Sequence, residues 1–294
     1  MDACEITDEK LSTVEHSIST AEVSEDNSPD VEMEEDREAV KPTAYIADKL
    51  LSDEGAQAKV YKARAVDRKN NVIVCEKEFA LKVFNMRSRT NAGGKAATEY
   101  AVSEKLKGRP HVIETFHFFE KEGEVTLPCG TRVSEPTCIS MEVCPHGDLC
   151  DFMINNGAIK DEILLKQLML QLCSGINDMH TIAEYAHQDI KLENILIDKD
   201  FKLKIIDFGF AMPTSKDIAI HQGTPGYEAP EILNVASRVG PRHTYRGVQA
   251  DIFSLGVVFF ILKFGVPPFK IAKKDDMNFG LFLRKPDMFW KYHP

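Results

Sequence analysis

The sequence predicts an α+β fold in which strands come first and helices follow. Residues 111–120 and 137–143 have the composition of two strands, and a longer segment with Gly and Pro joins them. Further along, a helix capped by Asp161 is predicted by apolar residues at helical spacing: Leu165, Leu168, Leu172, Ile176 and Met179. Residues 252–262 form an apolar stretch typical of a buried helix. Strands followed by helices are the order expected of the α+β class.

Composition separates an acidic N-terminal segment from a nearly neutral remainder. The chain has 294 residues, enough for one large domain or two modest ones. Residues 1–40 hold fourteen Asp or Glu, two Lys or Arg and no aromatic residue, which predicts a disordered acidic tail that solubilises the protein or docks a partner. The remainder carries a net charge of only +2, so nothing in the charge favours a nucleic-acid partner.

The cysteines and the apolar stretches bear on localisation. The seven cysteines contain no CxxC pair, and an odd number argues against a disulfide framework, so we expect a cytoplasmic protein, with the nucleus also possible. The N-terminus lacks the apolar core of a signal peptide. The stretch 252–262 is too short to cross a bilayer, so no membrane insertion is expected.

The most informative stretch runs from Tyr185 to Ala211. It contains His187-Gln188-Asp189, then Lys191 and Asn194, and later Asp207-Phe208-Gly209. Between them, residues 195–198 and 201–207 alternate around Lys199-Asp200, which predicts a hairpin that returns Asp207 towards Asn194. Amide and carboxylate oxygens are hard ligands of the kind that Mg²⁺ prefers. A surface turn with chance carboxylates is the alternative, but six positions in order make it a poor one.

This stretch resembles the catalytic loop and magnesium loop of eukaryotic protein kinases of the serine/threonine type, with Gln188 in place of an Arg. Further matches follow in the family's order: Phe79 to Val83 with Lys82, Glu99, Gly223-Thr224-Pro225, Ala229-Pro230-Glu231 and Asp251. The resemblance covers about residues 45–294. Because several separate motifs agree in order, it is far more specific than any one motif.

The resemblance implies a bilobal fold. It implies a small antiparallel sheet with one helix at 45–141, a hinge at 142–147 and a mainly helical lobe at 148–294, which is expected to be incomplete at its C-terminus. The activity implied is transfer of the ATP γ-phosphate, with Mg²⁺, to a Ser or Thr hydroxyl of a protein substrate. Two rivals remain open. One is a pseudokinase scaffold that binds partners without catalysis, and the remoter one is a small-molecule kinase.

The resemblance also implies roles for individual residues. Asp189 would orient the acceptor hydroxyl and accept its proton, with Lys191 at the phosphate and Thr224 in support. Asn194 and Asp207 would hold the metal. Lys82 would bind the α- and β-phosphates and be held by Glu99, for which Glu104 is an alternative with the wrong spacing. The expected nucleotide contacts are Gly55, Val60, Ala80, Lys82, Met141, Glu142, Cys144 and Leu196. Structural roles are expected for His187, Phe208, Gly209, Glu231 and Asp251.

Substrate preference and regulation are further expectations. Asp148 and Glu193 would recognise a basic residue about three positions before the acceptor, although two merely exposed carboxylates are an equal alternative. Gln188 cannot pair with a phosphate as Arg does, and residues 218–222 contain no Ser, Thr or Tyr. We therefore expect activity without activation-loop phosphorylation.

Two other departures from the family pattern concern the glycine-rich loop and the C-terminus. Asp53 and Ala58 replace glycines in the loop, which leaves only Gly55 and predicts loose nucleotide binding. In the resembled family, an Arg from further along the lobe usually pairs with the Glu at the position of Glu231, and a buried carboxylate left unpaired would be costly. The chain is therefore expected to be either a fragment or a kinase with an unusually reduced C-terminal portion, and both alternatives stay open.

Overall fold

The computed structural model describes residues 42–53, 58–67, 72–85, 92–235 and 243–293. The predicted acidic tail and Gly55 lie outside these residues. The chain divides into two compact units, Met1–Ala96 with Thr115–Val143, and Ala97–Glu114 with Cys144–Pro294. Residues 97–114 differ from the expected 45–141 lobe because they join the second unit. Within that unit, the Lys105 ammonium donates to the Ala183 carbonyl at 3.0 Å, and the Ile113 N–H donates to the Ile205 carbonyl at 3.1 Å.

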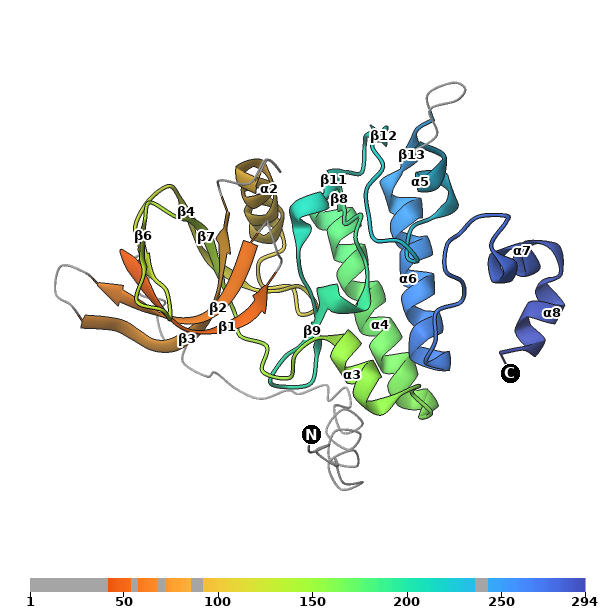
Figure 1. Cartoon of the computed structure of the whole chain (residues 1–294), viewed down its shortest axis with the longest axis horizontal. Coiled ribbons are helices and arrows are strands. Elements are labelled where there is room, and N and C mark those ends of the chain that lie inside the picture. Colours follow the sequence, from red (N-terminus) through yellow and green to blue (C-terminus); the bar gives the residue numbers. More distant parts are fainter. Residues whose placement is uncertain (1–41, 54–57, 68–71, 86–91, 236–242, 294) are drawn as a thin grey trace, which may run out of the picture. The chain divides into compact units, whose positions relative to one another are not determined.

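The first unit is built on a seven-stranded sheet (Figure 1), whose strand order is β4-β7-β3-β2-β1-β5-β6. Its neighbouring strands pair antiparallel, except β1 with β5, which are parallel. The strands are β1 (Ala44–Asp53), β2 (Ala58–Asp67), β3 (Val72–Phe84), β4 (Thr115–Glu120), β5 (Glu124–Thr126), β6 (Arg132–Ser134) and β7 (Thr137–Met141). The two strands predicted at 111–120 and 137–143 correspond to β4 and β7, which pair directly.

The two faces of this sheet have different environments because successive side chains on a strand point to opposite sides. Tyr61, Phe79 and Leu81 belong to the buried cluster on one face. Tyr45 packs there against Phe79, with ring centroids 5.8 Å apart and nearly perpendicular planes. Such edge-to-face contacts add to the burial of large apolar side chains. The opposite face of β3 carries Ala80 and Lys82.

The second unit is mainly helical. Besides most of α2 (Ala92–Lys105), it contains α3 (Leu149–Asn156), α4 (Glu162–Asp178), α5 (Pro230–Val235), α6 (Gly247–Phe264), α7 (Met277–Arg284) and α8 (Pro286–Lys291). Short antiparallel pairs connect its loops: β8 (Tyr185–Ala186) with β11 (Met212–Pro213), β9 (Ile195–Ile197) with β10 (Leu203–Ile205), and β12 (Asp217–Ile218) with β13 (Tyr245–Arg246). Strands followed by helices confirm the predicted α+β class.

Helices α4 and α6 lie side by side in the core of this unit (Figure 1). The predicted cap of α4 is confirmed, because the Asp161 carboxylate accepts a hydrogen bond from the Leu164 N–H at 2.8 Å. The predicted helix at 252–262 is longer than expected and spans Gly247–Phe264. Among the described residues, α6 is the one helix that is long and apolar enough, by those measures alone, to cross a membrane. Ten of its residues are buried in the protein, including the charged Asp251, and a buried core helix has the same composition.

Candidate active site

The hairpin predicted around Lys199-Asp200 is confirmed. Strands β9 and β10 pair antiparallel, with Ile197 opposite Leu203 and Ile195 opposite Ile205. The Asp198 carboxylate shapes the turn by accepting hydrogen bonds from the Asp200 and Lys202 N–H groups at 2.8 and 2.9 Å. At the open end of the hairpin, the Ile206 N–H donates to the Asn194 carbonyl at 3.0 Å. The chain therefore enters Asp207 directly beside Asn194.

Asp251 holds the start of the catalytic loop from the first turns of α6. Its carboxylate accepts hydrogen bonds from the backbone N–H groups of His187 and Gln188, at 2.6 and 2.8 Å, and from the Gln188 side-chain amide at 3.1 Å. His180, in the single π-helical turn Met179–Ala183 that follows α4, places Nε2 2.8 Å from the same carboxylate. Asp251 is 1% exposed. These hydrogen bonds satisfy both oxygens of a carboxylate that is shielded from water.

His187 is fully buried and connects the catalytic loop, which carries Asp189, with the segment that leads into Asp207. Its Nδ1 accepts the Asp189 N–H at 3.2 Å, and its Nε2 lies 2.8 Å from the Ile206 carbonyl. A carbonyl can only accept, so the proton sits on Nε2 and the ring is the neutral tautomer. The Phe208 ring packs edge-on against His187, with centroids 5.7 Å apart. His187 thereby fixes Asp189 relative to the residue that precedes Asp207.

Asp189 lies at the centre of a cluster of donors. Thr224 Oγ1 donates to Asp189 Oδ1 at 2.6 Å. Lys191 Nζ lies 3.0 Å from Asp189 Oδ2 and donates to Thr224 Oγ1 at 3.0 Å. The Asn194 amide donates to the Asp189 carbonyl at 2.8 Å and to Oδ2 at 3.2 Å. Three sequence-predicted residues, from the loop and from the segment near 224, thus converge on one buried carboxylate.

The donor set at Asn194 and Asp207 fits a hard divalent cation. Both Asn194 hydrogen bonds use the amide nitrogen, so the amide oxygen faces away from Asp189. Asp207 has a left-handed backbone, with φ of 63°, and its Oδ1 accepts the Gly209 N–H at 3.3 Å. Within the described residues, no group of three His, Cys, Asp or Glu side chains could hold a metal. Two oxygen ligands suit Mg²⁺, which takes its remaining ligands from water and phosphate.

In the first unit, four predicted nucleotide residues share one face of the sheet. Strand register places Val60 opposite Lys82, and Ala80 opposite Met141. Directly opposed residues point to the same side of a sheet, as do Ala80 and Lys82 two positions apart. Lys82 is 4% exposed, and its ammonium lies 5.5 Å from the centroid of the Phe84 ring. An aliphatic floor beside a buried ammonium is suitable for an adenine ring and its phosphates.

The other predicted nucleotide residues are more dispersed. Glu142 and Cys144 lie in the irregular segment after β7, at the boundary of the two units, and Leu196 lies in β9. Glu99 is buried in α2 and belongs to the second unit, whereas Lys82 belongs to the first. The pairing of Lys82 with Glu99 therefore stays a prediction.

The two carboxylates predicted to recognise substrate lie near one another around Cys150. Asp148 caps α3 by accepting the Asp151 N–H at 2.8 Å, so one of its oxygens is already engaged. Glu193 is exposed in a short 3₁₀ turn. Burial, followed by the negative charges of Glu193, Asp148 and Asp151, raises the pKa of the Cys150 thiol. Three carboxylates thus give this part of the surface a negative potential.

The segment between Asp207 and Glu231 is held by backbone pairing at several points. Met212 pairs with Ala186, and Ile218 pairs with Tyr245. Its connection to the catalytic loop does not use the Gln188 side chain, which is 4% exposed and donates inward to the Gly247 carbonyl at 3.1 Å as well as to Asp251. Gln188 has a left-handed backbone, with φ of 71°, which helps to direct the amide towards α6.

Glu231, for which a structural role was predicted, is not a deeply buried carboxylate. Its side chain is only partly buried in the first turn of α5, where the helix dipole favours a negative charge. The buried carboxylate of this segment is Glu228, which sequence reasoning missed. Glu228 Oε1 lies 3.1 Å from His221 Nε2 but is not aligned for a hydrogen bond. Burial raises the pKa of Glu228, His221 lowers it, and the negative charge of Asp189 raises it further.

These features define the class of protein. The model of the family described as "Protein kinase domain" matches residues 53–288, and the chain belongs to this family. It is 30% identical over 239 residues to the "Probable cell cycle serine/threonine-protein kinase CDC5 homolog" of Encephalitozoon cuniculi, covering 80% of this chain and 44% of the relative. It is 30% identical to the "CBL-interacting serine/threonine-protein kinase 10" of Arabidopsis thaliana (83% and 46%). It is 28% identical to the "Maternal embryonic leucine zipper kinase" of Xenopus laevis (72% and 29%).

The family establishes the protein-kinase-like α+β fold of a sheet unit and a helical unit. The chain spans less than half the length of each of these relatives. What the relatives' names say about cell cycle, partners and signalling applies to those proteins.

Proposed function

We propose that this protein is an ATP-dependent serine/threonine protein kinase. The observation that carries the proposal is the donor cluster around Asp189, in which Thr224, Lys191 and Asn194 all reach its carboxylate. Phosphoryl transfer needs a positioned acceptor hydroxyl and compensation of negative charge more than covalent chemistry. Asp189 orients the hydroxyl and receives its proton, and Lys191 places a positive charge where the phosphoryl group arrives.

ATP and Mg²⁺ are the cofactors proposed. Asn194 and Asp207 supply oxygen ligands for the metal, and Lys82 with Val60, Ala80 and Met141 offers a surface for the nucleotide. When bound, Mg²⁺ neutralises phosphate charge. Loose nucleotide binding stays the prediction for the replaced glycines. The Asp53 carboxylate pairs with Lys59 at 2.8 Å, with both side chains 46% exposed. That pairing offsets the charge that would otherwise repel phosphate.

Ser or Thr acceptors are favoured over Tyr. Lys191 Nζ contacts both Asp189 and Thr224, and Thr224 donates to Asp189, so the lysine and the threonine act together on this carboxylate. This lysine and threonine are the residues by which the sequence resembles the serine/threonine type. Peptides that differ only in a Ser, Thr or Tyr acceptor test the preference directly. Faster phosphorylation of the Tyr peptide would contradict it.

The enzyme is proposed to be active without phosphorylation of its activation segment. The Gln188 amide donates to Gly247 and Asp251, and the β8–β11 and β12–β13 pairs connect the activation segment to its surroundings through the backbone. Protein treated with phosphatase, and the double variant Thr214→Ala with Ser215→Ala, should therefore keep the activity of the untreated protein. A large loss that traces to Thr214 or Ser215 would refute this idea.

The rival is a pseudokinase that binds nucleotide or partners without transfer, and the departures in the glycine-rich loop favour it. Asp189→Ala removes the proposed base and should lower kcat about 10²-fold or more if catalysis is genuine. Asp200→Ala, at the exposed turn of the β9–β10 hairpin, is the matched control and should keep full activity. If the purified wild type binds ATP with Mg²⁺ but transfers no phosphate, the pseudokinase is the correct reading.

Substrates are proposed to be proteins with a basic residue before the acceptor. The carboxylates of Asp148, Asp151 and Glu193, close enough to Cys150 to raise its thiol pKa, supply the complementary charge. A peptide array in which this basic residue is scanned by position tests the preference. Selection for acidic or proline-directed peptides would remove it. A reducing cytoplasm or nucleus is proposed as its location, because the chain has an odd number of cysteines and no CxxC pair.

A further inference from the structure

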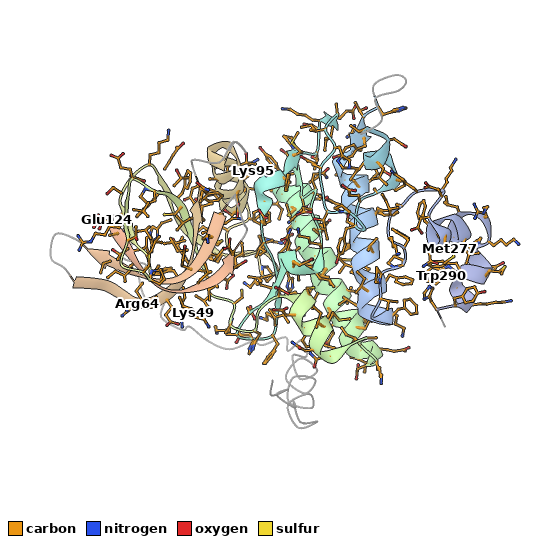
Figure 2. The ribbon with its side chains drawn as sticks, in the orientation of Figure 1. Lys49, Arg64, Lys95, Glu124, Met277 and Trp290 are labelled. Carbon is orange, nitrogen blue, oxygen red and sulfur yellow. The ribbon has the colours of Figure 1, made fainter. Side chains whose placement is uncertain are left out.

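An apolar groove lies in the second unit, away from the donor cluster. It has a volume of about 240 Å³. One wall is a face of α6 with Ile252, Phe253 and Val257, and the other comes from α7 and α8 with Phe282, Phe289 and Trp290. Figure 2 shows Met277 and Trp290 at this end of the unit, on α7 and α8. The groove is thus built from elements that the proposed reaction does not use.

The walls of the groove are formed by packed aromatic rings that remain partly exposed. The Phe289 ring lies 5.2 Å from Trp290 and 5.3 Å from Phe282, both nearly perpendicular. Ile252 is nevertheless 56% exposed and Trp290 47% exposed. Contiguous exposed apolar side chains of this kind mark interaction sites in folded proteins.

The floor of the groove is open at Gly256 in the middle of α6. A Cβ added at Gly256 meets no atom within 4 Å, although the glycine lies among the lining residues. The helix therefore leaves room for a foreign side chain at this point. It also provides a position where the groove can be filled without a clash.

The chain segment that supplies the aromatic wall of the groove is basic. Residues 263–293 contain seven Lys or Arg and three Asp. The exposed cations nearest in sequence to the aromatic wall are Arg284, Lys285 and Lys291, and three more lysines lie in the loop before α7. Excess positive charge around an apolar groove favours an occupant that is both acidic and apolar.

We propose that the acidic N-terminal segment of the same molecule, residues 1–40, docks into this groove. The segment has a net charge of −12 and intersperses apolar residues among its carboxylates. Leu11, Val14 and Ile18 follow each other at intervals of three and four residues, which is the spacing of one helix face. Its charge and its apolar side chains complement the basic surroundings and the aromatic wall.

Length does not restrict this docking. An extended chain covers about 3.3 Å per residue, so forty residues span on the order of 130 Å. This is several times the size of a folded domain, whose radius of gyration is near 20 Å at this length. The segment can therefore reach the groove on its own molecule.

Trp290 is the only tryptophan in the chain and lies in the groove, so its fluorescence reports occupancy in the full-length protein. Docking should shield it from water, as anchor residues are shielded in an interface. Changing Leu11, Val14 and Ile18 to Ser should expose Trp290 to water. Acrylamide quenching of its fluorescence should then be about twofold stronger than in the wild type, and its emission should shift to the red. Replacing Glu32, Glu34, Glu35 and Asp36 by Gln or Asn, or raising the salt to about 1 M, should have the same effect, because charge attraction is screened.

Filling the groove tests the same contact from the other side. Gly256→Leu should release residues 1–40 from the groove. Changing Leu11, Val14 and Ile18 to Ser in this variant should then cause no further change in Trp290 quenching. Lys199→Glu, at the distant β9–β10 turn, is the control for an altered surface charge and should leave quenching unchanged. Thermal unfolding of each variant establishes that the domain is intact.

Two outcomes would overturn the proposal. Equal quenching of Trp290 in the wild type and in both N-terminal variants would mean that the segment does not occupy the groove. Shielding that disappears on dilution would mean that the occupant is a second copy of the chain and not the segment of the same molecule. Activity is not the readout here, so the result is independent of the proposed kinase function.

Discussion

Asp251→Asn is the sharpest test of how the catalytic loop is held. The carboxylate accepts Gln188 N–H and the Gln188 amide through Oδ1, and His187 N–H and His180 through Oδ2. An Asn of the same shape keeps one acceptor oxygen and turns an NH₂ group towards the other two donors. Two hydrogen bonds to a charged group are therefore lost, and two buried donors are left without an acceptor.

The expected cost is large relative to the stability of a domain. Hydrogen bonds to charged groups contribute about 1.5–3 kcal/mol each, so two lost bonds lower the free energy of unfolding by about 3–6 kcal/mol. Typical domains have only about 5–15 kcal/mol in total. The folded fraction should also lose activity, because a displacement of about 1 Å in the loop that carries Asp189 costs on the order of 10²-fold in rate.

Urea unfolding and peptide phosphorylation, measured on the same preparations, separate these two effects. Asp198→Ala is the matched control. It also removes two hydrogen bonds to a buried carboxylate, at the turn end of the β9–β10 hairpin, and should lower stability comparably with little change in kcat. If Asp251→Asn unfolds at the wild-type urea concentration and retains full kcat, Asp251 does not position the loop.

Further predictions concern four positions in the second unit. Thr224→Val removes the 2.6 Å donor to Asp189 and should lower kcat about tenfold, a loss of about 1.4 kcal/mol, with recovery in Thr224→Ser. Burial raises the pKa of Glu228, so the folded state favours the neutral carboxyl group. The stability that this preference gives the fold is fully present below the pKa of Glu228 in the unfolded state. It is lost as the pH rises through the pKa of Glu228 in the folded state. The melting temperature of the wild type should then fall relative to Glu228→Gln from pH 4 to pH 8, and parallel curves would contradict this. Gly175→Ala places a Cβ 2.8 Å from the His111 carbonyl and should cost about 1–3 kcal/mol, whereas Gly256→Ala meets open space and should stabilise by up to about 1 kcal/mol in urea unfolding.

Local features of the fold were the most predictable from the sequence. The Asp161 cap and the helical spacing after it, and the alternation on either side of Lys199-Asp200, depend on residues close together in the chain. Their physical causes, capping and side-chain periodicity, are visible in a short window. The same reasoning underestimated α6, because its first five residues include Gly247 and the charged Asp251 and do not look apolar.

Contacts between distant segments were less predictable. Asp251 lies more than sixty residues from the loop that it holds, and only the family resemblance suggested the connection. The bidentate pair of Arg109 with the buried Asp178, at 2.8 Å for both bonds, was not anticipated at all. The buried Glu228 was also missed, because the sequence places it in a motif of mixed polarity and gives no sign of which carboxylate turns inward. Burial is a property of the assembled unit, which a local pattern does not contain.

The π-helical turn at Met179–Ala183 has a consequence for how this sequence can change over time. It sets the angle at which His180 leaves the end of α4 and meets Asp251. Each residue of a helix rotates its successors by about 100°, so a one-residue insertion or deletion between Asp161 and His180 would swing the imidazole away from α6. Substitutions on the exposed side of α4 leave that angle alone. Related chains should therefore vary in residue type between Asp161 and His180 but rarely in the number of residues there.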